Sequence, residues 1–421
     1  LMALLFIGFA AAMAAGTFIE DAYNTETARI LVYNTWWFEA IMVFFVINFF
    51  GNIKRYQLYK KEKWATLLLH LSFIFIIIGA FVTRYISYEG LMPIREGAIS
   101  NTVYSDMPHL TTFVDGEYQG EMKRKTIENQ LLLSQAVNNT FSYSDKFSDI
   151  PYKIELQEFI MNASQTFKPN AKGDLYIKLV EASGGSRKEH FLRDGEVKNI
   201  SNVLFAFNKF TQGAVNISKI AEAYTIQTPF DGNFMRMADK FQGTISKDKA
   251  SPLMFRSLYN AGGSQFVFPE LAQNGEVVLA SNNDYKDKKT DDAIVVKVTS
   301  QNKEEIVTLM GSKGKQGEPK SFKIGKLDFT LMYGSKVHTL PFSIKLNDFV
   351  AEKYPGTEKS YSAFKSKIEI QDKEKSKTFT DSVFMNHILD YREFRFFQAS
   401  FDEDEKGTVL SVNHDFWGTW I

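Results

Sequence analysis

Three long apolar segments within the first 83 residues set the strongest limit on how this chain folds. They cover residues 1–18, 36–52 and 64–83, and Glu39 is the one formally charged residue among them. A bilayer core of about 30 Å is crossed by about 20 consecutive apolar residues in a helix. The segments therefore predict at least three transmembrane helices over residues 1–83.

The first segment also allows a second interpretation. An apolar run that ends in small residues, here around 11–16, is typical of a cleaved signal peptide. Because two further apolar segments follow closely, the sequence favours a first transmembrane helix.

The connections between these segments predict the orientation in the membrane. Residues 53–63 carry one acidic residue and five basic residues, which are Lys54, Arg55, Lys60, Lys61 and Lys63. Short loops rich in Lys and Arg stay in the cytoplasm. Because each helix crosses to the opposite side of the membrane, the chain after Arg84 is expected on the outer, periplasmic side of a bacterial cytoplasmic (inner) membrane. The protein is then a multi-pass membrane protein.

The composition excludes several classes of protein. Lys+Arg and Asp+Glu both number 49, and this zero balance lacks the basic excess typical of a protein that binds nucleic acid. There is no Cys, so a disulfide scaffold, a thiolate nucleophile and Cys-ligated metal centres are excluded.

Residues 84–412 predict a large, mainly β extracytoplasmic domain. Apolar and polar residues alternate with a period near two at 152–159, 174–180, 293–298, 342–349 and 364–370. Turn signals such as Asp194-Gly195 and Pro355-Gly356 separate such segments. We expect two packed sandwich-like or barrel-like lobes.

An internal similarity predicts that this domain contains a duplicated β unit. IPYKIELQEF at 150–159 matches LPFSIKLNDF at 340–349, and each is followed by further strands ending in a Phe-rich one. The expected units are 150–210 and 340–401, with chance similarity between amphipathic strands as the alternative. Between them, residues 228–274 alternate weakly and predict an inserted helical or loop region.

The two ends of the chain indicate a piece of a longer protein. The sequence starts inside an apolar run without an initiating Met, and it stops at Ile421 after an aromatic cluster. We expect residues 413–421 to begin a further transmembrane span.

His70 is the strongest candidate for a functional residue. It lies about six residues beyond the basic loop, or roughly 9 Å into the bilayer at about 1.5 Å per residue. Placing an ionisable side chain inside a membrane span costs free energy, so such a residue is first considered a functional candidate. A neutral imidazole is a good axial ligand for haem iron, whereas the structural alternative is a hydrogen bond to a neighbouring helix.

The remaining candidates favour structural roles. Glu39 lies near the outer end of its segment, where a carboxylate can reach headgroup water. The other histidines show no HExxH or similar metal spacing; they are His109, His190, His338, His387 and His414. No GxSxG, Walker A or dinucleotide pattern occurs, so no catalytic residue is assigned. The Gly-rich segment 311–317 is expected to be a hairpin turn.

Motifs at both ends of the chain resemble one family. The N-terminal part contains GTFIE at 16–20, WFE at 37–39 and LHLSF at 69–73, and the C-terminal part contains REFRFFQAS at 392–400 and VLSVNHD at 409–415. In order and topology these resemble ResB, the membrane anchor of System II cytochrome c maturation. The family often has Asp-Pro-Gly near its last span, but here Asp415 precedes Phe-Trp-Gly, so no catalytic loop is assigned there.

The resemblance implies a partner and a substrate. ResB works with ResC (CcsA), as two chains or as a fused CcsBA protein, in a holocytochrome c synthase (haem lyase) complex. The complex moves haem b outward and joins its vinyl groups as thioethers to Cys-x-x-Cys-His of apocytochrome c. This chain has no WWD motif and resembles the ResB half, so the core catalytic motifs are expected on the ResC-like partner.

The resemblance also assigns a binding residue. It places the inner transmembrane ligand of haem iron on His70. Positions 70, 73, 74 and 77 share one helical face, so Phe73, Ile74 and Ile77 are expected to form an apolar wall beside the imidazole. The alternative function is a membrane-tethered, extracytoplasmic protein-binding or scaffold module without haem, although three early spans with an intramembrane His exceed what a tether needs.

Overall fold

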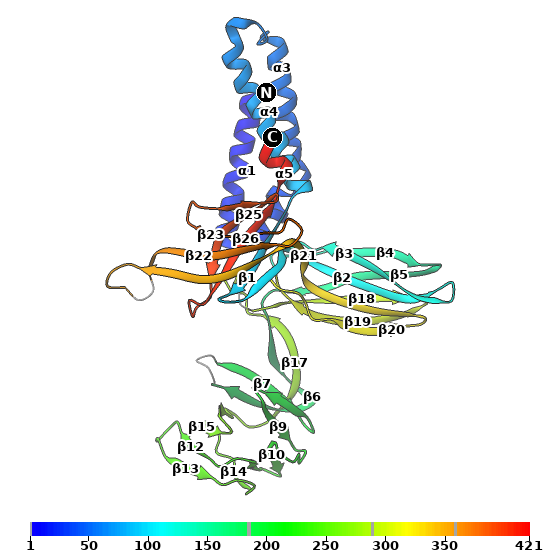
Figure 1. Cartoon of the computed structure of the whole chain (residues 1–421). Helices are drawn as coiled ribbons and strands as arrows, with labels where there is room; N and C mark the ends of the chain where they lie inside the picture. The colour runs from blue at the N-terminus through cyan, green and yellow to red at the C-terminus, as the bar shows by residue number, and fades with distance from the viewer. Residues whose placement is uncertain (1, 183–186, 288–289, 358–359) are drawn as a thin grey trace. The chain divides into compact units, whose positions relative to one another are not determined.

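The chain forms two compact units. The computed structural model describes residues 2–182, 187–287, 290–357 and 360–421. Unit 1 comprises Leu1–Asn162 and Asn283–Ile421, and unit 2 comprises Ala163–Asn282. Among the described residues, unit 1 holds all the helices and the larger part of the β structure (Figure 1).

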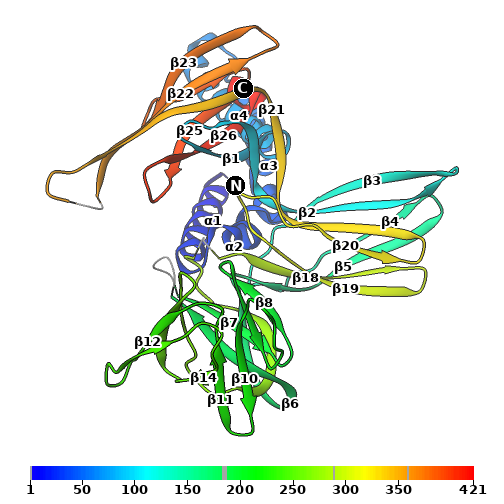
Figure 2. The same ribbon diagram turned by 60° about the horizontal axis from the view of Figure 1, so that its bottom comes forward.

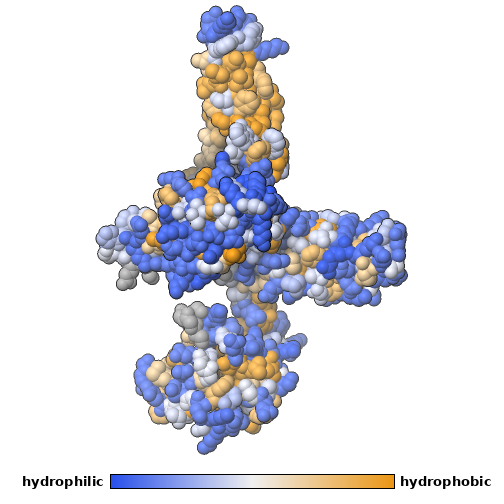
Figure 3. All heavy atoms as spheres, in the orientation of Figure 1, coloured by the Kyte–Doolittle hydropathy of each residue, from blue (hydrophilic) through white to orange (hydrophobic). Residues whose placement is uncertain are grey.

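Unit 1 begins with three helices that are long and apolar enough to cross a membrane. They are α1 (Met2–Ala22), α3 (Trp36–Arg55) and α4 (Trp64–Ile86), with the 3-10 turn η2 (Lys61–Lys63) before α4. Their outward surface is apolar, and the basic connection caps one end of the bundle (Figure 3). The predicted membrane protein with three N-terminal helices and a large β domain is confirmed, and α4 continues three residues beyond its predicted end.

The three helices pack around a small aromatic and aliphatic core. Phe45 and Phe49 of α3 and Ile74 of α4 are buried, and α1 contributes Met2, Leu5 and Phe9 to the same cluster. Because lipid tails are as apolar as these side chains, close packing and not the hydrophobic effect holds such a bundle together.

A short bent segment joins α1 to α3. It consists of α2 (Thr25–Ala28) and the π-helical turn η1 (Arg29–Tyr33). The side chain of Asn24 caps α2 by accepting a 2.9 Å hydrogen bond from the backbone N–H of Thr27. The ring of Tyr33 lies where a Cβ at position 16 would stand, so Gly16 allows η1 to pack closely on α1.

The main sheet of unit 1 has ten strands. Its order is β23-β22-β21-β2-β1-β26-β25-β24, with β3 on β2 and β20 on β21. The strands are β1 (Tyr88–Arg95), β2 (Ile99–Tyr118), β3 (Glu121–Gln130), β20 (Lys320–Ile324), β21 (Leu327–Lys353), β22 (Tyr361–Asp372), β23 (Lys377–Phe384), β24 (Leu389–Tyr391), β25 (Phe394–Phe401) and β26 (Gly407–His414).

Two long strands divide this sheet between two cores. The register of β2 with β21 shifts between Tyr104 and Pro108, which marks a bulge. On one side of it, β2, β3, β20 and β21 cover a second sheet, β19-β18-β5-β4, around one core (Figure 2). On the other side, β1, β21, β22, β25 and β26 enclose another. The second sheet contains β4 (Ser142–Phe147), β5 (Ile150–Ile160), β18 (Asp292–Ser300) and β19 (Lys303–Gly311).

Unit 2 is a β structure with its own core. A five-stranded sheet, β14-β11-β10-β9-β8, and a seven-stranded sheet enclose it. The strands are β6 (Ala163–Glu181), β7 (Lys188–Arg193), β8 (Val197–Ile200), β9 (Val203–Phe207), β10 (Val215–Ile220), β11 (Ala223–Gln227), β12 (Gly232–Arg236), β13 (Gln242–Ile245), β14 (Ser251–Pro252), β15 (Ser257–Ala261), β16 (Ser264–Val267) and β17 (Gln273–Ser281).

The strand pairing does not support the predicted duplication. In the segment 150–210, β5 pairs in the second sheet of unit 1, whereas β6 to β9 pair within unit 2. In 340–401, β21, β22 and β23 are consecutive neighbours in one sheet. The prediction of an inserted helical or loop region at 228–274 was wrong, because β12 to β16 lie there. Its weak alternation reflects five short strands, the longest of five residues, joined by tight turns.

The segment expected to begin a further span folds as a short helix, α5 (Phe416–Trp420). Asp415 caps it by accepting a 3.0 Å hydrogen bond from the N–H of Gly418 and another from the hydroxyl of Thr83 in α4. Gly79 of α4 faces the backbone of Gly418. Two glycines thus bring α4 and α5 together.

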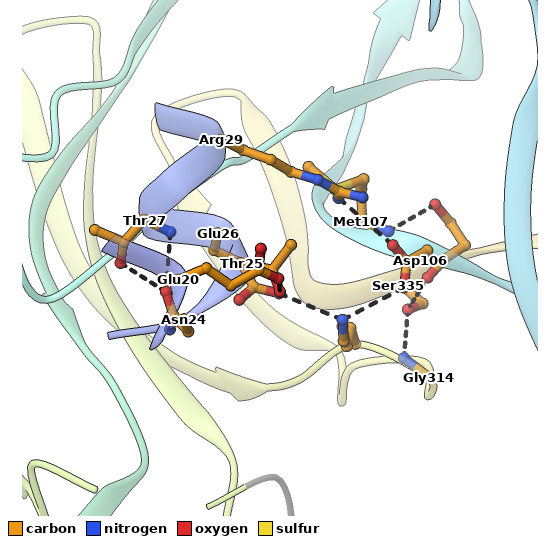
Figure 4. A network of polar contacts seen from close by, with 12 residues as sticks. Glu20, Asn24, Thr25, Glu26, Thr27, Arg29, Asp106, Met107, Gly314 and Ser335 are labelled. Atoms are coloured by element: carbon orange, nitrogen blue, oxygen red, sulfur yellow. Dashed lines mark hydrogen bonds and ion pairs between the residues drawn. The ribbon is translucent and has the colours of Figure 1, made fainter. Parts of the chain in front are cut away.

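A polar network fixes the α2–η1 segment to the β structure of unit 1 (Figure 4). The ammonium group of Lys313 lies 3.3 Å from Glu26 and 3.4 Å from Asp106, and Arg29 lies 3.5 Å from Asp106. Asp106 sits in the bulge of β2, and Lys313 lies in the β19–β20 connection. This connection was predicted to be a hairpin turn, but β19 pairs with β18 and β20 pairs with β21, so it joins two different sheets. Although burial opposes it, the two carboxylates raise the pKa of Lys313.

Replacing this central ammonium should loosen the segment. Lys313→Ala leaves Glu26 and Asp106 with one fewer cation between them, and we expect it to lower the local free energy of opening at residues 24–33 by about 1 kcal/mol. Amide hydrogen exchange in detergent measures this. Lys323→Ala, which removes an exposed partner of Asp328, should leave the segment unchanged. Equal protection in both variants would contradict a docking role for the network.

Asp292 binds Asn162, the last residue of the first segment of unit 1. Its carboxylate accepts a 2.8 Å hydrogen bond from the N–H of Asn162, whose side chain donates to the carbonyl of Asp284 at 2.7 Å. Asn162 is buried and has a φ of +47°. Burial raises the pKa of Asp292 to about 6 despite this hydrogen bond, and Glu26 adds to the effect.

This pKa predicts a pH-dependent stability. An unfolded Asp titrates near 3.9, so the native state binds more protons than the unfolded state between about pH 4 and 6. The contribution of Asp292 is therefore complete below about pH 4 and is lost as the pH rises through about 6. Asp292→Asn keeps the acceptor and should raise stability at pH 7 by on the order of 2 kcal/mol. Amide hydrogen exchange at Asn162, measured from about pH 4 to 7 in both proteins, gives the opening free energy that checks this. If this free energy has the same pH dependence in the wild type and in Asp292→Asn, the prediction is refuted.

Candidate functional site

His70 lies in α4, half-buried, at the side of the bundle where α4 meets α3. Its ring packs edge-on against Phe49 of α3, with centroids 5.5 Å apart and planes at 86°. It is six residues beyond Trp64, the first residue of α4. The imidazole therefore lies within the apolar part of the bundle, nearer the end that carries the basic connection.

The hydrogen bonding of His70 determines its tautomer. Nδ1 lies 2.9 Å from the backbone carbonyl oxygen of Thr66, one helical turn earlier. A carbonyl oxygen only accepts, so Nδ1 carries the proton and donates. In a neutral ring this leaves the lone pair on Nε2, and among the described residues no hydrogen bond reaches that atom. Histidines that bind metals commonly have this arrangement, with the second ring nitrogen donating to a carbonyl or carboxylate.

The predicted wall residues have different surroundings. Phe73 is 41% exposed and stacks on Phe49 at 5.5 Å with nearly parallel planes. Ile74 is buried in the bundle core, and Ile77 packs against that core. The ring that contacts His70 is therefore Phe49, Phe73 stacks on Phe49, and Ile74 and Ile77 hold α4 on the bundle.

Phe49 was missed in the sequence analysis, although a signal for it exists. It precedes Arg55, the last residue of α3, by six positions, and His70 follows the first residue of α4 by six positions. In an antiparallel helix pair, residues at equal distances from the connection lie at equal depth. This rule places Phe49 opposite His70.

The carboxylate of Glu39 makes contacts that hold neighbouring helices together. Glu39 forms a 2.8 Å ion pair with Arg84 of α4 and accepts a hydrogen bond of 2.8 Å from the hydroxyl of Tyr85. Arg84 also donates to the carbonyl oxygen of Tyr33. These contacts join α3, α4 and η1, as the structural interpretation of Glu39 predicts.

The fold brings two other histidines together at the base of the helices. Tyr88, which begins β1, is stacked between His338 and His414, with ring centroids 4.1 and 5.0 Å away. Burial lowers the pKa of His338, and Lys336 lowers it further. Strand register creates this stack, because Tyr88 pairs with His414 on β26. No spacing in the sequence could reveal it.

None of the described residues forms a metal-binding cluster of three or more His, Asp or Glu side chains. The remaining histidines have local partners: His109 bonds to the carbonyl oxygen of Met107, His190 lies 3.3 Å from Glu181, and His387 bonds to the carbonyl oxygen of Ser382. His70 is thus the candidate whose geometry suits a single axial ligand.

The C-terminal part of the β structure is similar to a known family. Residues 316–418, which run from before β20 into α5, match the model of the ResB-like family. This part of the chain is similar to that family. Over 414 residues, 98% of its length, it is 24% identical to Protein NrfI of Wolinella succinogenes. The chain covers 32% of that protein, so it spans about a third of the length of the curated relative it matches.

Proposed function

We propose that this chain is the ResB-like subunit or half of a cytochrome c maturation complex that exports haem and supports its attachment to apocytochrome c. The observation that carries the proposal is the Nε2 atom of His70, which keeps its lone pair within an apolar helix bundle. The match to the ResB-like family supports the cytochrome c context.

The residues around His70 suit a porphyrin. Haem is a flat apolar ring with an iron that accepts one imidazole on each side. Phe49 and Phe73 supply aromatic surface beside the imidazole, and the hydrogen bond to Thr66 fixes the ring orientation. When bound, haem supplies the vinyl groups that become thioethers; this chain's part is to hold the iron with His70.

The complex needs a second component. His70 is the one histidine in the three long helices, so the second axial ligand and the rest of the pocket are proposed to come from a ResC/CcsA-like partner, fused or separate. We propose that the core catalytic motifs of the haem lyase lie on that partner, and that this chain alone binds haem weakly or not at all.

Replacing His70 by Ala in the complete complex tests this function. Losing an outer partner of a metal ligand typically lowers affinity about 10- to 100-fold, and losing the ligand itself should cost at least as much. We expect the haem absorption band to be lost or shifted and cytochrome c maturation to fall, while the β structure stays folded.

His387→Ala is the matched control. His387 makes the same Nδ1 bond to a carbonyl oxygen, at 2.8 Å, but lies in the β23–β24 turn. It should leave haem content and maturation unchanged. A His70→Ala complex with unaltered haem spectrum and maturation would refute the ligand assignment and favour the scaffold function without haem.

The proposed orientation has its own test. We propose that residues 53–63 face the cytoplasm and that the β structure lies on the periplasmic side of the inner membrane. Because the chain has no Cys, a single cysteine can report position. Lys60→Cys should be protected from an impermeant thiol reagent in intact spheroplasts, and Lys323→Cys, on exposed β20, should react. The opposite pattern would reverse the orientation.

A further inference from the structure

A tight apolar turn is exposed between β23 and β24. Its five residues, Phe384, Met385, Asn386, His387 and Ile388, are all exposed, and Met385 is 62% exposed. From 382 to 389 the sequence has no Asp, Glu, Lys or Arg, whereas 23% of the whole chain is charged. We refer to residues 384–388 as the apolar tip.

Local contacts fix the shape of the apolar tip. Phe384 and His387 exchange backbone hydrogen bonds of 3.1 and 2.9 Å across the turn, and their rings stack at 4.6 Å. His387 also donates from Nδ1 to the carbonyl oxygen of Ser382. The structured turn therefore holds Met385 outward. Each square ångström of apolar surface left in water costs about 25 cal/mol, which favours an apolar environment for the tip.

The strand order places the apolar tip beside the membrane-spanning part. In β24, Asp390 pairs with Arg395 and Tyr391 with Phe394, and Phe394 pairs with His414 at the end of β26. Asp390 lines one cavity together with Phe416 and Trp420 of α5.

Helix α5 in turn packs against the spanning helix α4 through Thr83 and Asp415. Only Leu389 separates the tip from Asp390. Figure 1 shows β23 and β25 at the end of the β structure from which the helices extend.

We propose that the apolar tip inserts into the headgroup region of the membrane leaflet next to the β structure, as a contact separate from the helices. The occupant is the bilayer because Asp390, two residues beyond the tip, lines a cavity with Phe416 and Trp420 of α5, and α5 packs against α4. The Lys365 ammonium lies 5.3 Å from the ring of Phe384, and a Lys beside an aromatic ring suits the boundary between apolar chains and phosphates. This contact is independent of haem.

Site-directed spin labelling tests the insertion, because the chain has no Cys to remove. The chain is reconstituted in phosphatidylcholine–phosphatidylglycerol vesicles with a nitroxide on Met385→Cys or, separately, Ile388→Cys. Collisions with oxygen, which concentrates in lipid, are compared with collisions with a water-soluble nickel chelate. Both positions should show a higher oxygen-to-chelate ratio than Met122→Cys and Ile306→Cys, which replace side chains 67% and 60% exposed in β3 and β19.

Ile76→Cys on the outward face of α4, with a side chain 63% exposed, sets the value for full lipid contact. Positions 385 and 388 should fall between this value and that of 122. A ratio at both positions equal to that at 122 would overturn the proposal. Exclusion of both reagents would also overturn it and would assign the tip to a contact with a second copy of the chain.

Discussion

The absence of water inside a bilayer governs the arrangement of this chain more than any other constraint. Every backbone group in the apolar segments must find a partner within its own helix, which makes α1, α3 and α4 continuous helices. The same rule acts on His70, whose Nδ1–H is satisfied by the carbonyl oxygen of Thr66 in its own helix. Among the described residues the Nε2 lone pair then has no hydrogen-bond partner, and Phe49, on which Phe73 stacks, packs edge-on against the imidazole.

Two groups of contacts, among others, join the helices to the β structure of unit 1. One is the ion network of Glu26, Arg29, Asp106 and Lys313, which holds the α1–α3 connection against a bulge in β2. The other is the pairing of β1 with β26, the strands that continue into α4 and α5. Strand register thus sets where two helices leave the β structure, and the Thr83–Asp415 hydrogen bond and the Gly79–Gly418 contact set how they pack.

Local sequence patterns predicted much of this fold. The features that depend on pairing between distant strands could not be predicted from the sequence. The three helices follow from apolar length, and the β character follows from period-two alternation. The apparent repeat at 150–159 and 340–349 misled because amphipathic strands resemble one another while their partners differ: β5 pairs with β18, but β21 pairs with β2. At the site, the sequence alone identified His70, because it is an imidazole within a predicted transmembrane helix. Phe49 required the antiparallel depth rule, and the stack of His338, Tyr88 and His414 depends on a register that no spacing encodes.

The central claim is that His70 acts through its Nε2 lone pair and not through its packing against Phe49. Chemical rescue separates these roles most directly. In the complete complex, His70→Gly opens a space the size of an imidazole and should abolish or shift the haem absorption band. Added imidazole, which supplies a nitrogen lone pair, should restore the band in a saturable manner, whereas a ring of similar size without a free lone pair, such as pyrrole, should not. A band that survives in His70→Gly, or that imidazole and pyrrole restore equally, would contradict ligation by His70.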